Sequence, residues 1–259
     1  MTLANRLAAD EVVITAWSGV PDALTVELMA AQPFDAVTLD MQHGGHHEDS
    51  VLRSIVPVKR AQKPVIVRIP VGRFDMASRA LDFGADAVIA PMVNSVEDAR
   101  RFAAAMKYPP VGERSWGPTF GLPRYGKTTM QAWLEESNRR TLAFAMIETR
   151  QALDALDDIL AVPGIDAIFL GPSDFSIAWS GGKTVNSTLE DMMETVASVA
   201  ARARAAGKFT GIYVIDPSIA GRFVKMGYRL LATGSEGQLI ARGAELQLGA
   251  IKNSIGQGG

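Results

Sequence analysis

The sequence predicts a (β/α)8 barrel, on three observations. Short apolar segments alternate with segments of helical pattern along most of the 259 residues. The short segments are apolar throughout rather than alternating, which is typical of parallel strands covered on both faces. The chain also has the usual length of one α/β barrel, so we expect residues 1–259 to form a single domain.

Eight strand candidates follow one another along the chain, and all but the sixth lead into a helix candidate. The strand candidates are residues 12–19, 35–41, 64–70, 86–93, 142–148, 166–174, 209–215 and 229–235. The helix candidates are residues 21–32, 48–62, 73–84, 95–107, 151–164, 216–227 and 237–255. An open doubly wound sheet is the alternative, but no G-x-G-x-x-G follows the first strand, which disfavours it.

Several helix boundaries are marked by their residue types. Ser95, with Asp98 three residues later, is a plausible N-cap, and Pro217 suits the first turn of a helix. Glycine, which tolerates the left-handed conformation, stands where four helices should end. These glycines are Gly84, Gly164, Gly207 and Gly227.

The connection between the fourth and fifth strands is much longer than the others. It runs through the Gly/Pro-rich residues 108–129 and a further helix candidate at residues 130–140. Long loops in compact domains are usually functional or mobile. The loop could cover a site of its own subunit, dock a neighbouring subunit, or be a solvated insertion. The residues that suggest the first two are Arg114, Trp116, Phe120, Arg124 and Tyr125.

Composition narrows the class of protein. The net charge is -2 with no dense Lys/Arg run, so we expect neither nucleic acid nor an anionic membrane as partner. The chain has no cysteine, which excludes disulfides, thiolate nucleophiles and Cys-ligated metals. No signal-peptide core and no apolar run of transmembrane length is present, so we expect a soluble cytoplasmic protein.

Polar residues stand where the strand candidates end, which in this fold is the catalytic face of the barrel. Glu148 and Asp174 end the fifth and sixth strands and could hold a hard divalent cation such as Mg²⁺ or Mn²⁺. The alternative is that both acids simply cap helices. The other polar strand ends are Asp40, Gln42 and His43, then Arg68, then Gly171 to Ser173, and finally Thr233 to Ser235.

Arg68 and His43 supply complementary chemistry. A guanidinium buried at the end of the third strand needs an anion, either a substrate carboxylate or enolate, or a structural partner such as Glu148 or Asp40. His43 is of the residue type best suited to proton transfer near neutral pH, and Asp40 could orient it. Zinc binding by His46 and His47 is disfavoured, since they lie in a glycine-rich, polar loop.

Some reaction classes are excluded by what the strands lack. No lysine lies within a strand candidate or at its C-terminal end, so Schiff-base chemistry is disfavoured and carbonyl activation would require a metal. Neither a G-x-S-x-G elbow nor a P-loop occurs.

At this point the chain resembles the HpcH/HpaI aldolase family of metal-dependent class II aldolases that act on 2-oxo acids. The resemblance extends from "AWSG" to "LLATGSE" and rests on "LDMQHG", "VRIP", "GERSWGP" and above all "IETRQALDALDDILAVPGIDAIFLGPSDFS". It departs from many members at Gln42, where they carry Glu, and at Met146, where they carry Gln. These departures leave the preferred 2-oxo acid open.

The resemblance implies roles for individual residues. It assigns Glu148 and Asp174 to the metal (Mg²⁺ or Mn²⁺, with Co²⁺ possible), Arg68 to the substrate, and His43 to proton transfer with Asp40 as partner. It gives the backbone amides of Gly171 and Ser173 to the substrate carboxylate. Further substrate-binding candidates are Trp17, Gln42 and Pro172.

The implied activity is reversible aldol addition and cleavage of 4-hydroxy-2-oxo acids. Pyruvate or hydroxypyruvate would be the nucleophile and an aldehyde the acceptor. The resemblance also implies a homo-oligomer, usually a hexamer, in which the final helix is exchanged between subunits. Two other functions stay open: an acyl-CoA lyase with the same metal acids, and a barrel that binds without catalysis.

Overall fold

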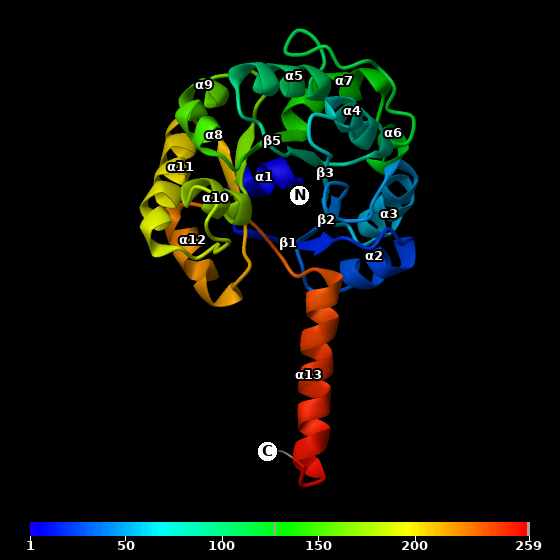
Figure 1. Ribbon diagram of the computed structural model, residues 1–259. Helices are drawn as coiled ribbons and strands as arrows, with labels where there is room; N and C mark the ends of the chain where they lie inside the picture. Colours follow the sequence, from blue (N-terminus) through cyan, green and yellow to red (C-terminus); the bar gives the residue numbers. More distant parts are fainter. Residues whose placement is uncertain (127, 258–259) are drawn as a thin grey trace.

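The computed structural model describes residues 1–126 and 128–257 as a closed barrel of eight parallel strands, β1 to β8 in chain order (Figure 1). β8 pairs with β1 and closes the barrel, which confirms the predicted fold class and all eight strand candidates. The strands are β1 Val13–Ser18, β2 Ala36–Asp40, β3 Val65–Arg68, β4 Ala87–Ala90, β5 Leu142–Ile147, β6 Ala167–Leu170, β7 Phe209–Tyr213 and β8 Leu230–Thr233.

Helices surround the barrel (Figure 1). The first half of the chain has α1 Leu3–Ala8, α2 Ala23–Ala30, α3 Glu48–Arg60, α4 Phe74–Phe83, α5 Val96–Met106, α6 Gly121–Arg124 and α7 Met130–Arg140. The second half has α8 Arg150–Asp154, α9 Leu156–Leu160, α10 Pro172–Trp179, α11 Met193–Ala205, α12 Ala220–Met226 and α13 Glu236–Ser254, with the 3-10 turns η1 Glu190–Met192 and η2 Pro217–Ile219.

Three of the predicted helix boundaries, at Ser95, Gly84 and Gly227, are confirmed. Ser95 is the N-cap of α5, and its hydroxyl accepts a hydrogen bond from the Asp98 amide at 3.1 Å. Gly84 and Gly227 end α4 and α12 with φ of 110° and 106°, a left-handed conformation that favours glycine. Pro217 opens the turn η2 rather than a full α-helix.

Four helices are absent from the sequence prediction: α1, α6, α10 and α11. α10 begins at Pro172, directly after β6, where the sequence had suggested strand as far as Asp174. Proline in the first helical position explains the early start, because its fixed φ already suits a helix. α11 is the helix between β6 and β7 for which the sequence offered no candidate. It buries Val196, Val199 and Ala203.

The core has two layers. Alternate strand residues fill the inside of the barrel, among them Trp17, Ile66, Phe144 and Phe169. The other strand residues pack outward against the helices in one large cluster. Because both faces of the strands are buried, the strands appear in the sequence as unbroken apolar runs.

The long connection packs against its own barrel. Arg114 is buried, pairs with Asp82 at 2.6 Å and stacks on the Tyr108 ring at 4.6 Å. Tyr125 donates a hydrogen bond to Asp86 at 2.9 Å. Within the described part of the chain, none of residues 107–140 lines the cavity described below, so the loop does not contact that cavity from its own subunit. Trp116 and Phe120 remain exposed.

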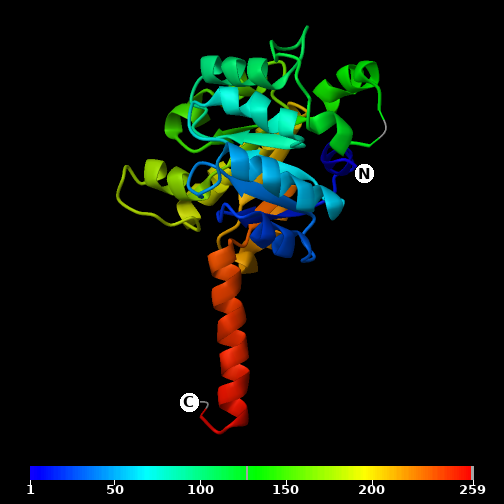
Figure 2. The same ribbon diagram turned by 90° about the vertical axis from the view of Figure 1, so that its right-hand side faces the viewer.

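The last helix, α13, leaves the barrel and projects away from it, as both views show (Figures 1 and 2). It follows β8 at the C-terminal mouth of the barrel, and most of its side chains are exposed. Among the residues that the structure describes, no helix has the length and apolar character needed to cross a membrane.

Candidate active site

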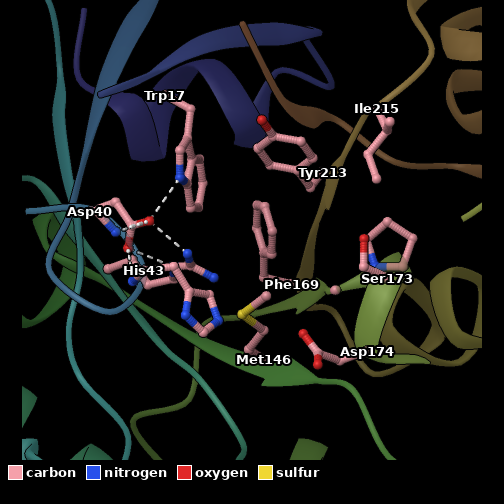
Figure 3. Close-up of a pocket in the computed structure, with 13 residues that line it drawn as sticks. Trp17, Asp40, His43, Met146, Phe169, Ser173, Asp174, Tyr213 and Ile215 are labelled. Carbon is pink, nitrogen blue, oxygen red and sulfur yellow. Dashed lines mark hydrogen bonds and ion pairs between the residues drawn. The ribbon is translucent and has the colours of Figure 1, made fainter. Parts of the chain in front are cut away.

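A cavity of about 290 Å³ opens at the C-terminal ends of the strands, where side chains from six strands and the loops after them converge (Figure 3). This is the face on which barrels of this kind carry their active sites. The cavity is lined by Trp17, Asp40, His43, Gly44, Arg68, Met146, Phe169, Gly171, Pro172, Ser173, Asp174, Tyr213 and Ile215.

Asp40 and Arg68 form a bidentate ion pair inside the cavity. Arg68 Nε donates to Asp40 Oδ1 at 2.8 Å and Nη2 donates to Oδ2 at 2.6 Å. The two residues lie opposite each other in the parallel register of β2 and β3, which brings their side chains together. Burial alone would raise the pKa of Asp40, but the hydrogen bonds and charge of Arg68 outweigh it and hold the pKa below its usual value. Asp40 therefore stays ionised.

The Asp40 carboxylate also shapes the loop that carries His43. It accepts hydrogen bonds from the backbone amides of Gln42 at 3.0 Å, His43 at 3.4 Å and Gly44 at 3.0 Å. In the described residues no hydrogen bond joins this carboxylate to the His43 imidazole. Asp40 therefore does not orient the ring directly, as expected, but holds the backbone of the loop that carries His43. The His43 side chain is exposed and faces the cavity (Figure 3).

An aromatic wall closes the side of the cavity formed by β1, β6 and β7. Trp17 packs edge-on against Tyr213 with ring centres 5.2 Å apart, and its ring lies 6.0 Å from that of Phe169. Its indole nitrogen donates to Asp40 Oδ2 at 3.2 Å, and the Arg68 guanidinium lies 4.8 Å from its ring centre. The wall thus holds the ion pair in place by stacking as well as by hydrogen bonding.

Glu148 lies below the cavity surface, at the end of β5. It is 1% exposed, and its Oε2 accepts a hydrogen bond from the Met92 amide at 2.8 Å. Met92 adopts a φ of 53°, a left-handed conformation that is unusual for methionine and aims this amide at the carboxylate. Burial raises the pKa of Glu148 to about 7, opposed by the Met92 hydrogen bond and reinforced by the negative charge of Asp174.

Gly171 lets β6 approach that carboxylate. A Cβ at this position would stand 2.5 Å from Glu148 Oε1 and 2.7 Å from the Met146 methyl group, so a larger residue would displace both. The Gly171 amide already donates a hydrogen bond to the Ile147 carbonyl oxygen at 3.3 Å. Of the two amides expected to hold a substrate carboxylate, the one at Ser173, in the first turn of α10, is therefore the better placed.

Asp174 belongs to the same first turn of α10 and is exposed at the cavity. It lies close enough to Glu148 for its negative charge to raise the pKa of that carboxyl. In residues 1–126 and 128–257, no three His, Cys, Asp or Glu side chains converge to form a complete metal cage. The two carboxylates nevertheless fit a hard divalent cation. Such a cation binds through one or two carboxylates and leaves other positions to water and substrate. It would also compensate the buried charge of Glu148 and its repulsion by Asp174, the two effects that raise the pKa of Glu148.

The remaining predicted residues divide into two groups. Trp17, Pro172 and Ser173 line the cavity as expected. Gln42 does not line it, and its Oε1 is buried without a hydrogen-bond partner in the described chain. His46 is buried between Ser18 and Ser50, whereas His47 is exposed.

Tyr213 and Ile215 line the cavity but do not appear among the residues predicted from sequence. Tyr213 ends β7 and Ile215 follows two residues later, in an apolar run that contains no charged residue. Strand alternation would have identified Tyr213, because residues two apart in a strand point to the same side and Gly211 and Tyr213 share one face.

Comparison with known proteins shows what the chain as a whole is similar to. A family model described as HpcH/HpaI aldolase/citrate lyase matches residues 14–243. The chain is 30% identical over 247 residues to a hydroxypyruvate/pyruvate aldolase of Roseovarius nubinhibens, covering 95% of each protein. It is 31% identical over 259 residues to a 4-hydroxy-2-oxo-heptane-1,7-dioate aldolase of Salmonella dublin, covering 98% of this chain and 97% of that protein. A crystal structure of an HpcH/HpaI aldolase from Desulfitobacterium hafniense DCB-2 superimposes with a TM-score of 0.88 at 27% identity, covering 97% of each chain.

Proposed function

The chain belongs to the HpcH/HpaI aldolase/citrate lyase family, and we propose that it is a divalent-metal-dependent aldolase. It adds the enolate of pyruvate or hydroxypyruvate to an aldehyde, giving a 4-hydroxy-2-oxo acid, and reverses the reaction. The observation that carries this proposal is that Asp174, Arg68 and His43 line one cavity at the barrel mouth, with the buried acid Glu148 beside Asp174. Within the described chain neither acid is held in an ion pair. Relatives that are named as aldolases support the same reaction class.

Glu148 and Asp174 would hold the cation, Mg²⁺ or Mn²⁺ with Co²⁺ as a further candidate. Bound there, it would act as a Lewis acid on the 2-oxo acid and make its C3 protons more acidic. Around it, the Ser173 amide at the start of α10 binds the substrate carboxylate, since first-turn amides have no acceptor within their own helix.

Arg68 stabilises the developing enolate. Its Nε and Nη2 are held by Asp40, whereas Nη1 makes no hydrogen bond within the described chain, and Arg68 lines the cavity. The ion pair thus fixes the guanidinium plane and leaves one edge for the substrate oxygen. A donor that is fixed before the reaction stabilises developing charge without a reorganisation cost.

His43 moves the proton. In the addition direction its imidazole takes a proton from C3, the resulting enolate forms the C3–C4 bond to the aldehyde, and the alkoxide recovers a proton from His43. In the cleavage direction His43 removes the proton of the 4-hydroxyl, the C3–C4 bond breaks, and the enolate is reprotonated. An exposed imidazole beside the cavity suits both directions.

The apolar wall of the cavity favours an uncharged acceptor aldehyde. This wall is formed by Trp17, Phe169, Tyr213 and Ile215. Arg68 is the only Lys or Arg among the described lining residues, and it is already paired with Asp40. The same scarcity of cations disfavours the alternative of an acyl-CoA substrate, whose phosphates need a basic groove.

The test is pyruvate release from a panel of 4-hydroxy-2-oxo acids, first with EDTA and then with Mg²⁺ or Mn²⁺ restored. We expect release to stop with EDTA and to recover with metal. Cleavage that persists after complete metal removal would refute the role of Glu148 and Asp174. If no substrate is cleaved in the presence of metal, and hydroxypyruvate is not accepted as a nucleophile either, the aldolase function itself is wrong.

We also propose that the protein is a homo-oligomer, a hexamer, in which α13 is exchanged between subunits. Leu246 and Ile240 on α13 are 75% and 70% exposed. On the barrel, Leu24 and Leu28 of α2 are each 70% exposed, and Ile14 of β1 is 40% exposed although the rest of its strand is buried. An apolar helix without a partner and an uncovered barrel seam are complementary surfaces.

A substitution on α13 tests this assembly. Leu246→Asp places a charge on the exposed apolar surface of the helix and should lower the mass measured by light scattering. Glu245→Gln, at the neighbouring exposed position, should leave the mass unchanged. An unchanged mass for Leu246→Asp would contradict the exchange.

A further inference from the structure

A buried network joins the base of α13 to the loop after β1. Glu236, the first residue of α13, is only 7% exposed. Its Oε1 accepts a hydrogen bond from the Ser18 hydroxyl at 2.6 Å and lies 3.3 Å from the Val20 amide, and its Oε2 accepts from the Gly19 amide at 2.9 Å. The carboxylate therefore holds three successive residues, Ser18 at the end of β1 and Gly19 and Val20 in the loop that follows.

The network continues into the loop after β2. Ser18 Oγ lies 2.9 Å from His46 Nε2, and His46 Nδ1 lies 3.1 Å from Ser50 Oγ at the start of α3. Because an ionised carboxylate only accepts hydrogen bonds, the single Ser18 proton goes to Glu236. Ser18 Oγ then accepts from His46 Nε2–H, which fixes the ring on the β2–α3 loop.

The two loops also touch through glycines next to His43. The Gly45 amide donates to the Gly19 carbonyl oxygen at 2.7 Å. A Cβ on Gly44 would stand 2.8 Å from Gly19 Cα and 2.5 Å from the Asp40 carbonyl oxygen, so the loops pack without room for a side chain. Whatever fixes Gly19 therefore also fixes Gly44, the residue after His43.

The start of α13 does not need Glu236. Ser235 is the N-cap, its hydroxyl accepts from the Gln238 amide, and the Gln238 side chain returns the bond in a capping box. Burying a carboxylate is unfavourable unless it gains compensating hydrogen bonds. The hydrogen bonds that Glu236 accepts all come from the end of β1 and the loop after it, so Glu236 stabilises that segment rather than the helix.

We propose that Glu236 is a positioning residue of the aldolase site, acting through Ser18 and His46 to hold the loop that presents His43 to the cavity. The inference rests on the proposed function. It assigns a role to the final acid of the "ATGSE" segment, which lies outside the cavity lining. It also makes the geometry of the proton-transferring loop depend on the root of the projecting helix (Figure 2).

Kinetics of the full-length protein provide the first test. Glu236→Gln keeps the size of the side chain but replaces one acceptor oxygen with an amide group that faces donors. We expect kcat for cleavage to fall about 10- to 100-fold, the range caused by small misplacements of catalytic groups, while KM and Mn²⁺ affinity stay at wild-type values. Glu245→Gln, the same change at an exposed position of α13, should leave all three unchanged.

Ser18→Ala is the second variant, because it removes the bridge to His46 but leaves the amides of Gly19 and Val20 available to Glu236. It should lower kcat in the same way, and the double variant should lose little more than Glu236→Gln alone. Equal loss of kcat and Mn²⁺ affinity, or fully additive effects of the two substitutions, would overturn the proposal.

Hydrogen exchange tests the positioning independently of activity. In Glu236→Gln, amides of residues 41–47 should exchange faster than in wild type and in Glu245→Gln, while light scattering shows unchanged assembly. Unchanged exchange in this segment overturns the positioning role even if activity is lost. An inactive wild type with the expected exchange pattern would instead overturn the aldolase function and leave Glu236 as the residue that orders this loop.

Discussion

Replacing Glu148 by Gln should stabilise the metal-free protein at alkaline pH while abolishing metal binding. Burial raises the pKa of Glu148 from 4.5 to about 7, with the Asp174 charge adding to the rise. Folding therefore favours the protonated acid. That contribution is fully present below pH 4.5 and is lost as the pH rises through 7. The rise in the pKa from 4.5 to about 7 corresponds to at most about 3 kcal/mol of folding free energy.

The assay is denaturant unfolding in EDTA at pH 5 and pH 8, at one protein concentration because oligomer stability depends on concentration. Glu148→Gln keeps the acceptor for the Met92 amide but carries no charge. Its free energy of unfolding relative to wild type should rise by up to about 3 kcal/mol between the two pH values. Mn²⁺ at 100 times its Kd should stabilise the wild type by about 2.7 kcal/mol at pH 8, and the variant not at all.

Two results would refute this reasoning. A difference between wild type and Glu148→Gln that does not change with pH would mean that the carboxylate is not held above its ordinary pKa. Equal stabilisation of both proteins by Mn²⁺ would mean that the cation binds elsewhere. Asp49→Asn is a suitable control, because Asp49 is exposed on α3, far from this pair in the chain, and should leave both readouts unchanged.

Three further substitutions separate the roles of the other residues. Arg68→Ala should lower kcat by about 100-fold or more while Mn²⁺ affinity is retained; equal loss of both would contradict its role toward the enolate. His43→Asn should lower the rate of C3 proton exchange of pyruvate, followed by NMR, by about 10²- to 10⁴-fold, and exchange at the wild-type rate would assign the proton to another group. Gly171→Ala puts a methyl group 2.5 Å from Glu148 Oε1 and should weaken Mn²⁺ binding by about 10- to 100-fold, measured by calorimetry; unchanged affinity would show that the carboxylate can move aside.

The strands could be predicted because the barrel buries them on both sides. Each becomes a continuous apolar run, and the polar residue that ends it is then conspicuous, as at Arg68 and Glu148. The same rule explains the failure at β6. There the apolar run passes directly into Gly171 and Pro172, and only the helical conformation of the next turn shows that the strand has ended.

Partners across strands could not be predicted, because they depend on register. The sequence left Arg68 with three possible anions, Asp40, Glu148 or a substrate. The pairing of β2 with β3 places Asp40 beside Arg68, so Asp40 is the anion that Arg68 binds within the protein. The buried network of Glu236 and Ser18 joins residues 218 positions apart, and no local pattern in the chain indicates it.

The two halves of the site have opposite electrostatic character. On β2 and β3, Asp40 and Arg68 compensate each other and need no further charge. At β5 and the start of α10, burial and the negative charge of Asp174 raise the pKa of Glu148 to about 7. Near neutrality a proton therefore neutralises the buried carboxylate and relieves the repulsion between the two acids. A divalent cation would relieve it more completely, so proton and metal compete for one carboxylate. Metal affinity of the unliganded protein should therefore increase as the pH rises toward 7 and level off above it. The ion pair of Asp40 and Arg68 should not change over this pH range.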